Sequence, residues 1–182
     1  MIQVKGTVNI QTSPEQVFAL VSDVRQCGAL NPRIEVINIT AEPAGQMREG
    51  TIFHYRIVVE GRMTEYTSKV LTFEPGRMIE IQTNTDPVVN IRYVIIPAAG
   101  GSSLEQELTS SLPEQESVPL ELTGWLAKLV GKVAKDTDSP EKRDALIKQE
   151  EAMMEEQLQI QLDEWLLIVK KYLEEQRGTF LA

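Results

Sequence analysis

The sequence predicts an α+β protein in which a curved, seven-stranded antiparallel sheet wraps around a long C-terminal helix. A run of strand-like segments with short turns between them extends from residue 34 to about 111, a pattern typical of antiparallel pairing. A single apolar face at helical spacing follows near the end, made of Leu158, Leu162, Trp165, Val169 and Tyr172. This face can cover one side of the sheet. A cavity between the sheet and the helix is therefore expected.

The chain opens with a strand and a capped helix. Apolar and polar side chains alternate through residues 2–10, so one face of this strand should be buried. Ser13 is a suitable N-cap, Pro14 stands at the first helical position, and Gln16 completes a capping box. A second short helical segment is expected within residues 23–32, where a glycine and an Asn-Pro pair interrupt the periodicity.

Six further strands are expected after these helices. They lie at 34–39 and at roughly 50–60, 63–73, 77–84, 88–97 and 103–111. Glycine and proline residues mark the turns between them. Because side chains alternate along a strand, Tyr55 and Ile57 should share the inner face, while His54 and Arg56 face outward.

Several inner-face residues bring polar atoms to an otherwise apolar concave surface. The candidate ligand-binding residues are Phe53, Tyr55, Tyr66, Ser68, Ile81, Tyr93, Gln106, Leu162 and Trp165. Apolar area with a few polar groups is what a small-molecule pocket needs. The alternative is that each polar side chain is a core residue bonded to backbone or water. Only the convergence of several of them favours a pocket.

Composition and charge narrow the classes of partner. A net charge of −9 and a pI near 4.8 disfavour nucleic acid, because phosphate binding needs a positive field. The lone Cys27 cannot form a disulfide within the chain, and no cysteine and histidine spacing suits zinc. No run approaches the ~18 apolar residues of a membrane span. We therefore expect a cytoplasmic protein with no metal, no cofactor and no stable membrane insertion.

No cluster of residues in the sequence indicates a catalytic site. His54 is the only histidine, and strand alternation turns it away from the cavity. Serine and cysteine nucleophiles then lack their usual activating base. Catalytic residues stay unknown at this point.

The stretch from Val8 to Asp23, with Ser-Pro-Glu-Gln-Val-Phe at the start of the helix, resembles the opening of the START-like or SRPBCC superfamily. It is most similar to members of the polyketide cyclase/dehydratase and lipid-transport type. The resemblance extends through Ser111 and again from about 145 to 176. It implies one START-like domain over residues 1–182 with the Bet v 1-like helix-grip fold and a hydrophobic cavity.

Residues 112–142 depart from that pattern as a helical insertion before the last helix. An amphipathic segment at 118–135 contains Trp125, and Ser139 and Pro140 can start the final helix. This segment can pack on the domain, act as a mobile lid, or contact a membrane or a partner. A second copy of the chain is one such partner, so a homodimer is a further expectation.

Three functions follow from these observations. The first is binding or transport of a small hydrophobic molecule, such as a lipid, an isoprenoid or an aromatic polyketide-like compound. The alternative, which the resemblance implies, is a polyketide cyclase/dehydratase-type enzyme on the same scaffold. Its proton-transfer group would be Tyr55, Tyr66 or Tyr93. The second alternative is a protein-interaction module that uses the 118–135 segment.

Overall fold

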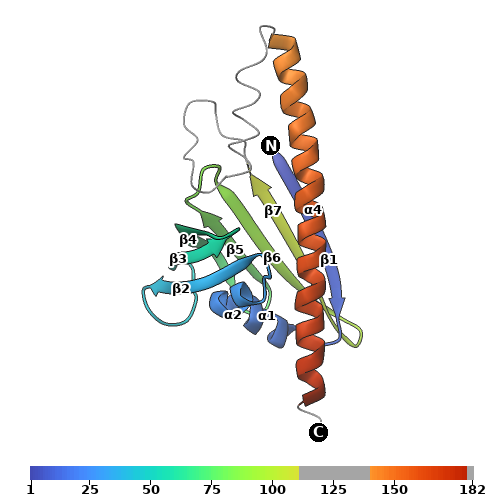
Figure 1. The fold of residues 1–182 in the computed structure, drawn as a ribbon. Coiled ribbons are helices and arrows are strands. Elements are labelled where there is room, and N and C mark those ends of the chain that lie inside the picture. The colour runs from blue at the N-terminus through green and yellow to red at the C-terminus, as the bar shows by residue number, and fades with distance from the viewer. Residues whose placement is uncertain (111–139, 180–182) are drawn as a thin grey trace.

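The computed structural model describes residues 1–110 and 140–179. The elements in this part are, in chain order, β1 (Ile2–Ile10), α1 (Pro14–Ser22), α2 (Val24–Ala29), β2 (Ile34–Glu42), β3 (Ile52–Val59), β4 (Arg62–Glu74), β5 (Met78–Thr83), β6 (Val89–Ala98), β7 (Gly101–Ser110) and α4 (Pro140–Thr179). Figure 1 shows the long α4 lying alongside β1, with α1 and α2 beneath the sheet.

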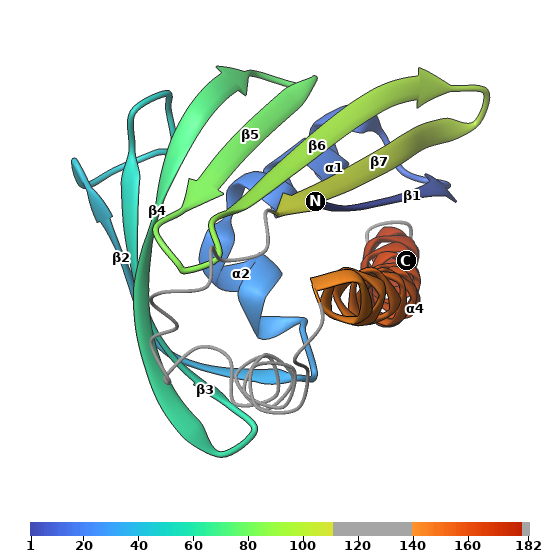
Figure 2. The same cartoon turned by 90° about the horizontal axis from the view of Figure 1, so that it is seen from above.

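The seven strands form one antiparallel sheet, as the sequence predicts. Their order is β1-β7-β6-β5-β4-β3-β2, so every pair except β1 with β7 joins strands that are consecutive in the chain. The sheet curves strongly, and its concave side holds α2 and faces α4 (Figure 2). The architecture is therefore an α+β helix-grip-like fold, which confirms the predicted class.

The two short helices begin where the sequence places them. Ser13 caps α1, and its Oγ accepts a hydrogen bond from the backbone N–H of Gln16 at 3.4 Å. Asp23 both follows α1 and caps α2, because its carboxylate accepts from the N–H of Gln26 at 3.0 Å. Asp23 is thus the only residue between the two helices, and the chain changes direction sharply there. This turn carries α2 into the concave side of the sheet.

Irregular pairing in two strands changes which side chains point inward. The register of β2 against β3 shifts between Val36 and Asn38, and the apolar Ile37 at this bulge is 47% exposed. A comparable shift lies between Val70 and Thr72 in β4. Bulges add twist and bend a strand, so both fit the strong curvature of this half of the sheet.

Helix α4 begins at Pro140, as the Ser-Pro pair predicts. Its first three residues, 140–142, therefore belong to the long helix and not to the predicted insertion. The rest of that insertion, including the 118–135 segment and Trp125, lies outside the described residues.

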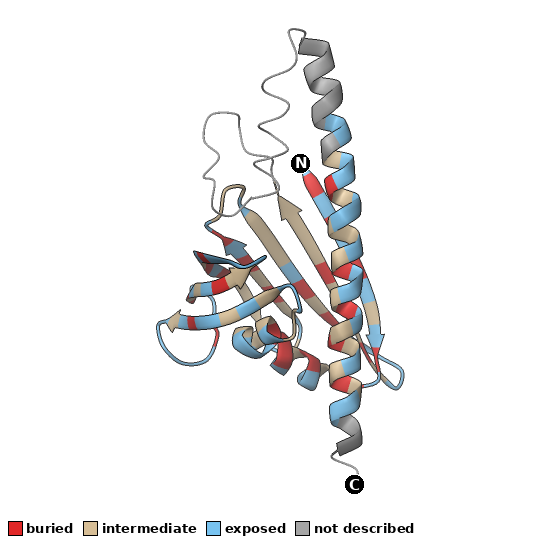
Figure 3. Cartoon of the chain, viewed as in Figure 1, coloured by how far each residue is buried: buried red, intermediate tan, exposed pale blue. Residues whose placement is uncertain are grey.

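The apolar face of α4 packs against β1 as expected. Leu162 and Val169 are 3% and 0% exposed, and Figure 3 shows the buried positions as a stripe along the helix. Burying one such aliphatic side chain contributes roughly 1.5 to 3 kcal/mol. The close approach depends on Gly6 in β1, where an added Cβ would lie 2.5 Å from Cδ1 of Leu166. Gly6 therefore sets how closely the helix approaches the sheet.

Polar side chains of α4 cover the open edge of β1. The Gln159 amide accepts from the Lys5 N–H at 3.3 Å and donates to the Lys5 carbonyl at 3.0 Å. Lys170 donates to the carbonyl of Asn9 at 2.9 Å. An edge strand otherwise presents unpaired backbone groups to other chains. Helix α4 thus protects this edge while its apolar face closes the core.

Candidate functional site

A cavity of about 320 Å³ lies between the concave sheet, α2 and α4; we call it the central cavity. It is lined by Val21, Val24, Cys27, Gly28, Asn31, Ile34, Ile39, Tyr55, Ile57, Tyr66, Ser68, Ile81, Thr83, Ile91, Tyr93, Gln106, Leu108, Leu158, Gln161, Leu162 and Trp165. All candidate residues from the sequence except Phe53 are among them. Residues from six strands and from α1, α2 and α4 thus meet around one space.

Phe53 lies elsewhere, in the wall of a second pocket. The residue is 7% exposed, and the centroid of its ring lies 6.4 Å from that of Tyr55. Strand alternation correctly places both rings on the inner face. It does not show that their side chains border different spaces, because that depends on the packing of α1 and the β2–β3 loop.

Two tyrosines and a serine form a connected group on the floor of the central cavity. Tyr55 and Tyr66 are cross-strand partners in β3 and β4, and their rings stack with centroids 4.4 Å apart and planes 5° apart. The Tyr55 hydroxyl is 3.0 Å from Oγ of Ser68. Stacking and the hydrogen bond hold both rings in a fixed orientation. A flat platform with a polar edge results.

Three other polar side chains around the cavity have no partner among the described residues. Gln106 is 5% exposed, and its Oε1 is buried without a hydrogen bond from any of them. In the register of β6 and β7, Gln106 lies opposite Tyr93. Within the described part of the chain, the hydroxyls of Tyr93 and Tyr66 also form no hydrogen bond. Buried polar groups are nearly always paired, so these three side chains are available to form hydrogen bonds with a molecule in the cavity.

Burial determines the protonation of the tyrosines. It raises the pKa of Tyr55 to about 12, against a smaller lowering effect from the Ser68 hydrogen bond. Burial likewise raises the pKa of Tyr66 and of Tyr93 above the usual value. A neutral phenol is the form that an apolar environment favours. At neutral pH all three hydroxyls are therefore protonated and able to donate a hydrogen bond, and none is a tyrosinate base.

The described wall of the cavity carries no charge. Among the residues 1–110 and 140–179 that line it, none is Asp, Glu, Lys, Arg or His. His54 lies on the outer face of β3, as predicted, with Nε2 3.5 Å from a carboxylate oxygen of Glu42 and a half-exposed ring. Burial raises the pKa of the Cys27 thiol to about 12, which leaves it protonated and unreactive. This wall can bind a ligand through apolar contacts and hydrogen bonds from neutral groups.

Sequence reasoning missed the wall that α1 and α2 contribute. Val21, Val24, Cys27 and Gly28 line the cavity, yet α2 has only six residues. A helix that short does not repeat its apolar spacing often enough to identify a face. The nearest signal was the small, apolar Cys27, three residues after Val24 in the same segment. Gln26 on the same helix reaches α4, and its Nε2 lies 2.6 Å from the Tyr172 hydroxyl.

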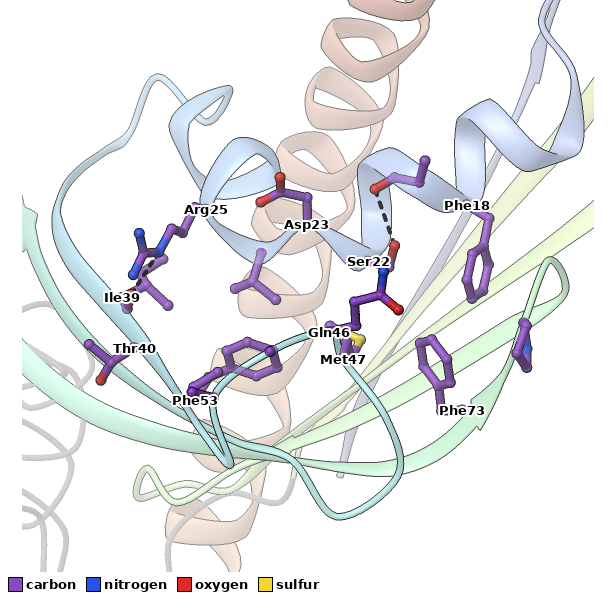
Figure 4. Close-up of a pocket in the computed structure, with 16 residues that line it drawn as sticks. Phe18, Ser22, Asp23, Arg25, Ile39, Thr40, Gln46, Met47, Phe53 and Phe73 are labelled. Atoms are coloured by element: carbon purple, nitrogen blue, oxygen red, sulfur yellow. Dashed lines mark hydrogen bonds between the residues drawn. The ribbon is translucent and has the colours of Figure 1, made fainter.

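A second pocket of about 800 Å³ lies between α1, α2 and the β2–β3 loop; we call it the α1–α2 groove. The rings of Phe18 and Phe73 lie side by side there, with centroids 5.5 Å apart and planes tilted by 58° (Figure 4). Arg25 also lines the groove, and its Nε donates to the carbonyl of Ile39 at 2.7 Å. Val24 and Ile39 border both pockets, so these two side chains separate the groove from the central cavity.

Neither a metal cluster nor a membrane-spanning helix is present in the described parts of the chain. Residues 1–110 and 140–179 contain no group of three or more His, Cys, Asp or Glu side chains placed to hold a metal ion. In the same ranges, no helix combines the length and apolar character needed to cross a membrane.

Solved structures with this fold include proteins of several kinds. The protein TTHA0849 from Thermus thermophilus matches at TM-score 0.56 and 18% identity, covering 94% of this chain and 96% of its own. The di-domain ARO/CYC StfQ from the steffimycin biosynthetic pathway matches at TM-score 0.61 and 12% identity, covering 97% of this chain and 52% of its own. Ara h 8.0201 matches at TM-score 0.51 and 15% identity, covering 83% and 95%. Identities this low establish the shared fold alone.

Comparison with family models shows to which protein family the chain belongs. No curated protein matches the chain significantly. The family model described as polyketide cyclase / dehydrase and lipid transport matches residues 1–137. That match includes the whole described sheet with α1 and α2, and so most of the wall of the central cavity. The chain therefore belongs to the polyketide cyclase / dehydrase and lipid transport family, on a scaffold for hydrophobic ligand binding or cyclisation.

Proposed function

We propose that this protein binds or carries a small hydrophobic molecule in the central cavity. The observation that carries the proposal is the combination of a largely apolar wall, uncharged in its described part, with the buried amide oxygen of Gln106, which lacks a partner among the described residues. Apolar area supplies affinity, and a few fixed polar groups supply orientation. Family membership supports the same class of function.

The central cavity suits this role better than the α1–α2 groove. The groove is larger, but Arg25 and Asp23 line it and Arg25 is already bonded to Ile39. Its wall includes the loop residues Ala44 to Met47. The central cavity is built mainly from strands and helices, whose side chains are held more rigidly. A ligand there would displace little water from charged groups, which lowers the cost of binding.

A titration with N-phenyl-1-naphthylamine, a neutral dye that fluoresces in apolar surroundings, tests the proposal. Ser68 is 3% exposed beside Tyr55, so Ser68→Trp places an indole inside the cavity. Lys69→Trp places the same ring on the outer face of β4 and is the matched control. We expect saturable binding to the wild type and to Lys69→Trp, and loss of binding in Ser68→Trp with an unchanged circular dichroism spectrum. Equal binding by all three proteins would refute the proposal.

Cyclase or dehydratase chemistry in the same cavity is the second candidate. The protonated hydroxyls of Tyr66 and Tyr93, unpaired within the described residues, favour it, because a donor of this kind can stabilise negative charge that develops on a substrate carbonyl. The described wall supplies no base. In this case, Tyr93→Phe should retain binding of a poly-β-ketone analogue and lose its conversion, followed as loss of water by mass spectrometry. Conversion unchanged in both Tyr66→Phe and Tyr93→Phe would dismiss it.

A further inference from the structure

We infer that the ligand of the central cavity is an uncharged ring compound bearing a hydroxyl group that donates a hydrogen bond to Gln106. The inference rests on the proposed function and specifies the class of ligand. It comes from three features of the described cavity wall: the unpaired amide, the neutral donors around it and the absence of charge.

The Gln106 amide oxygen has no donor among the described residues. Oε1 is buried, it accepts no hydrogen bond from them, and its side chain lines the cavity. Gln106 sits in the middle of β7, with Gly6 of β1 and Tyr93 of β6 as its register partners. Gly6 has no side chain to offer, and the Tyr93 hydroxyl forms no hydrogen bond within the described part of the chain. Leaving a buried acceptor unpaired is costly, and a ligand hydroxyl removes this cost.

The same ligand hydroxyl can also accept a hydrogen bond. A glutamine side chain presents a donor and an acceptor side by side, so one ligand hydroxyl can donate to Oε1 and accept from Nε2. The hydroxyls of Tyr66 and Tyr93 remain protonated donors because burial raises their pKa. They can pair with a carbonyl or a second hydroxyl on the same molecule. The polar part of the wall therefore matches an oxygen-bearing ligand, not an unfunctionalised hydrocarbon.

A charged ligand has no counterpart among the described residues of this cavity. A carboxylate or phosphate taken into an apolar space without a cation loses its hydration and gains little. Arg25 follows the wall residue Val24 in the chain, but it lines the α1–α2 groove and donates to Ile39. Free fatty acids and phospholipid head groups are therefore poor candidates for this space.

Ring shape follows from the stacked tyrosines and from volume. Tyr55 and Tyr66 present parallel planes, and aromatic faces pack well against other flat rings. A cavity of about 320 Å³ is at the small end of the range for ligand pockets. Two fused rings with one substituent fit such a volume.

Three naphthalene derivatives separate these requirements at pH 7. The probe 2-naphthol is neutral and has a donor, 2-methoxynaphthalene is neutral and lacks the donor, and 2-naphthoate is charged. Each is measured by its displacement of N-phenyl-1-naphthylamine from the wild type, from Gln106→Leu, and from the surface control Gln157→Leu. Leucine is close to glutamine in size and removes the acceptor without leaving a polar group unpaired.

We expect 2-naphthol to bind the wild type and Gln157→Leu at least about tenfold more tightly than either other probe. In Gln106→Leu the ratio between 2-naphthol and 2-methoxynaphthalene should fall to about one. Equal affinities in the wild type, a preference for 2-naphthoate, or a preference for 2-naphthol that persists in Gln106→Leu would each overturn the inference. If that variant does not fold, the wild-type ratios decide alone.

Binding of the dye tests the proposed function separately from the ligand class inferred above. Binding of N-phenyl-1-naphthylamine with no preference among the three probes would overturn the inference and leave hydrophobic ligand binding standing. Failure of the dye and of all three probes to bind would overturn both.

Discussion

Adding one methyl group at Gly6 should weaken the packing of α4 against the sheet. A Cβ at this position would lie 2.5 Å from Cδ1 of Leu166 and 3.2 Å from Cγ of Leu162. Carbon atoms pack best at about 3.5 to 4.0 Å, so the closer pair overlaps by about 1 Å. Overpacking of this kind costs about 1 to 3 kcal/mol in a dense core. We therefore expect Gly6→Ala to lower the free energy of unfolding by that amount, despite the better strand propensity of alanine.

A double-mutant cycle isolates the contact. Leu166 is 2% exposed, and Leu166→Ala alone should cost about 2 to 5 kcal/mol. In Gly6→Ala/Leu166→Ala the new methyl group enters the space that the leucine leaves, so the combined cost should be smaller than the sum by at least about 1 kcal/mol. Urea unfolding, monitored by circular dichroism, gives all four values, with Thr7→Ala on the exposed side of β1 as the control. Additive costs, or a neutral Gly6→Ala, would refute the packing argument.

Three further predictions concern stability. Gln159→Leu removes two hydrogen bonds to Lys5 at the edge of β1 and should lower the free energy of unfolding by about 1 to 3 kcal/mol. The control Gln157→Leu, on the exposed side of α4, should change it little. Equal losses of stability in urea unfolding would contradict the claim that α4 protects the edge of β1. Glu60 adopts a φ of 52° in the turn between β3 and β4, a conformation that asparagine tolerates better, so Glu60→Asn should raise the unfolding free energy by about 0.5 to 1 kcal/mol; a loss of stability would contradict this. Burial raises the Cys27 pKa from 9.0 to about 12, so the native state keeps the proton that the unfolded thiol releases. Stability should therefore decline from about pH 9 towards pH 12, less steeply in Cys27→Ala, and identical pH profiles would contradict the assignment.

Strand periodicity predicted the inner face of the sheet well, because side chains alternate whatever the helices do. Tyr55, Ser68, Tyr93 and Gln106 all reach the same cavity on this rule alone. The rule fails locally at bulges, as at Ile37, where one extra residue turns an apolar side chain outward. Nothing in a single strand shows where such a shift occurs.

Contacts between helices, strands and loops could not be predicted from the sequence. The separation of Phe53 from the central cavity depends on how α1 and the β2–β3 loop pack. The role of Gln159 depends on the position of α4 along β1, which helical periodicity does not specify. The unpaired state of Gln106 likewise emerges only when its described neighbours are in place. Ligand chemistry therefore had to be inferred from the assembled cavity.

Location of the bound ligand is the measurement that tests this account most directly. Heteronuclear NMR spectra recorded during titration with 2-naphthol report on both pockets at once. The account predicts that chemical-shift changes concentrate at Ser68, Leu162 and the side-chain amide of Gln106, in the central cavity. Changes concentrated instead at Gln46 and Met47, in the α1–α2 groove, would contradict it.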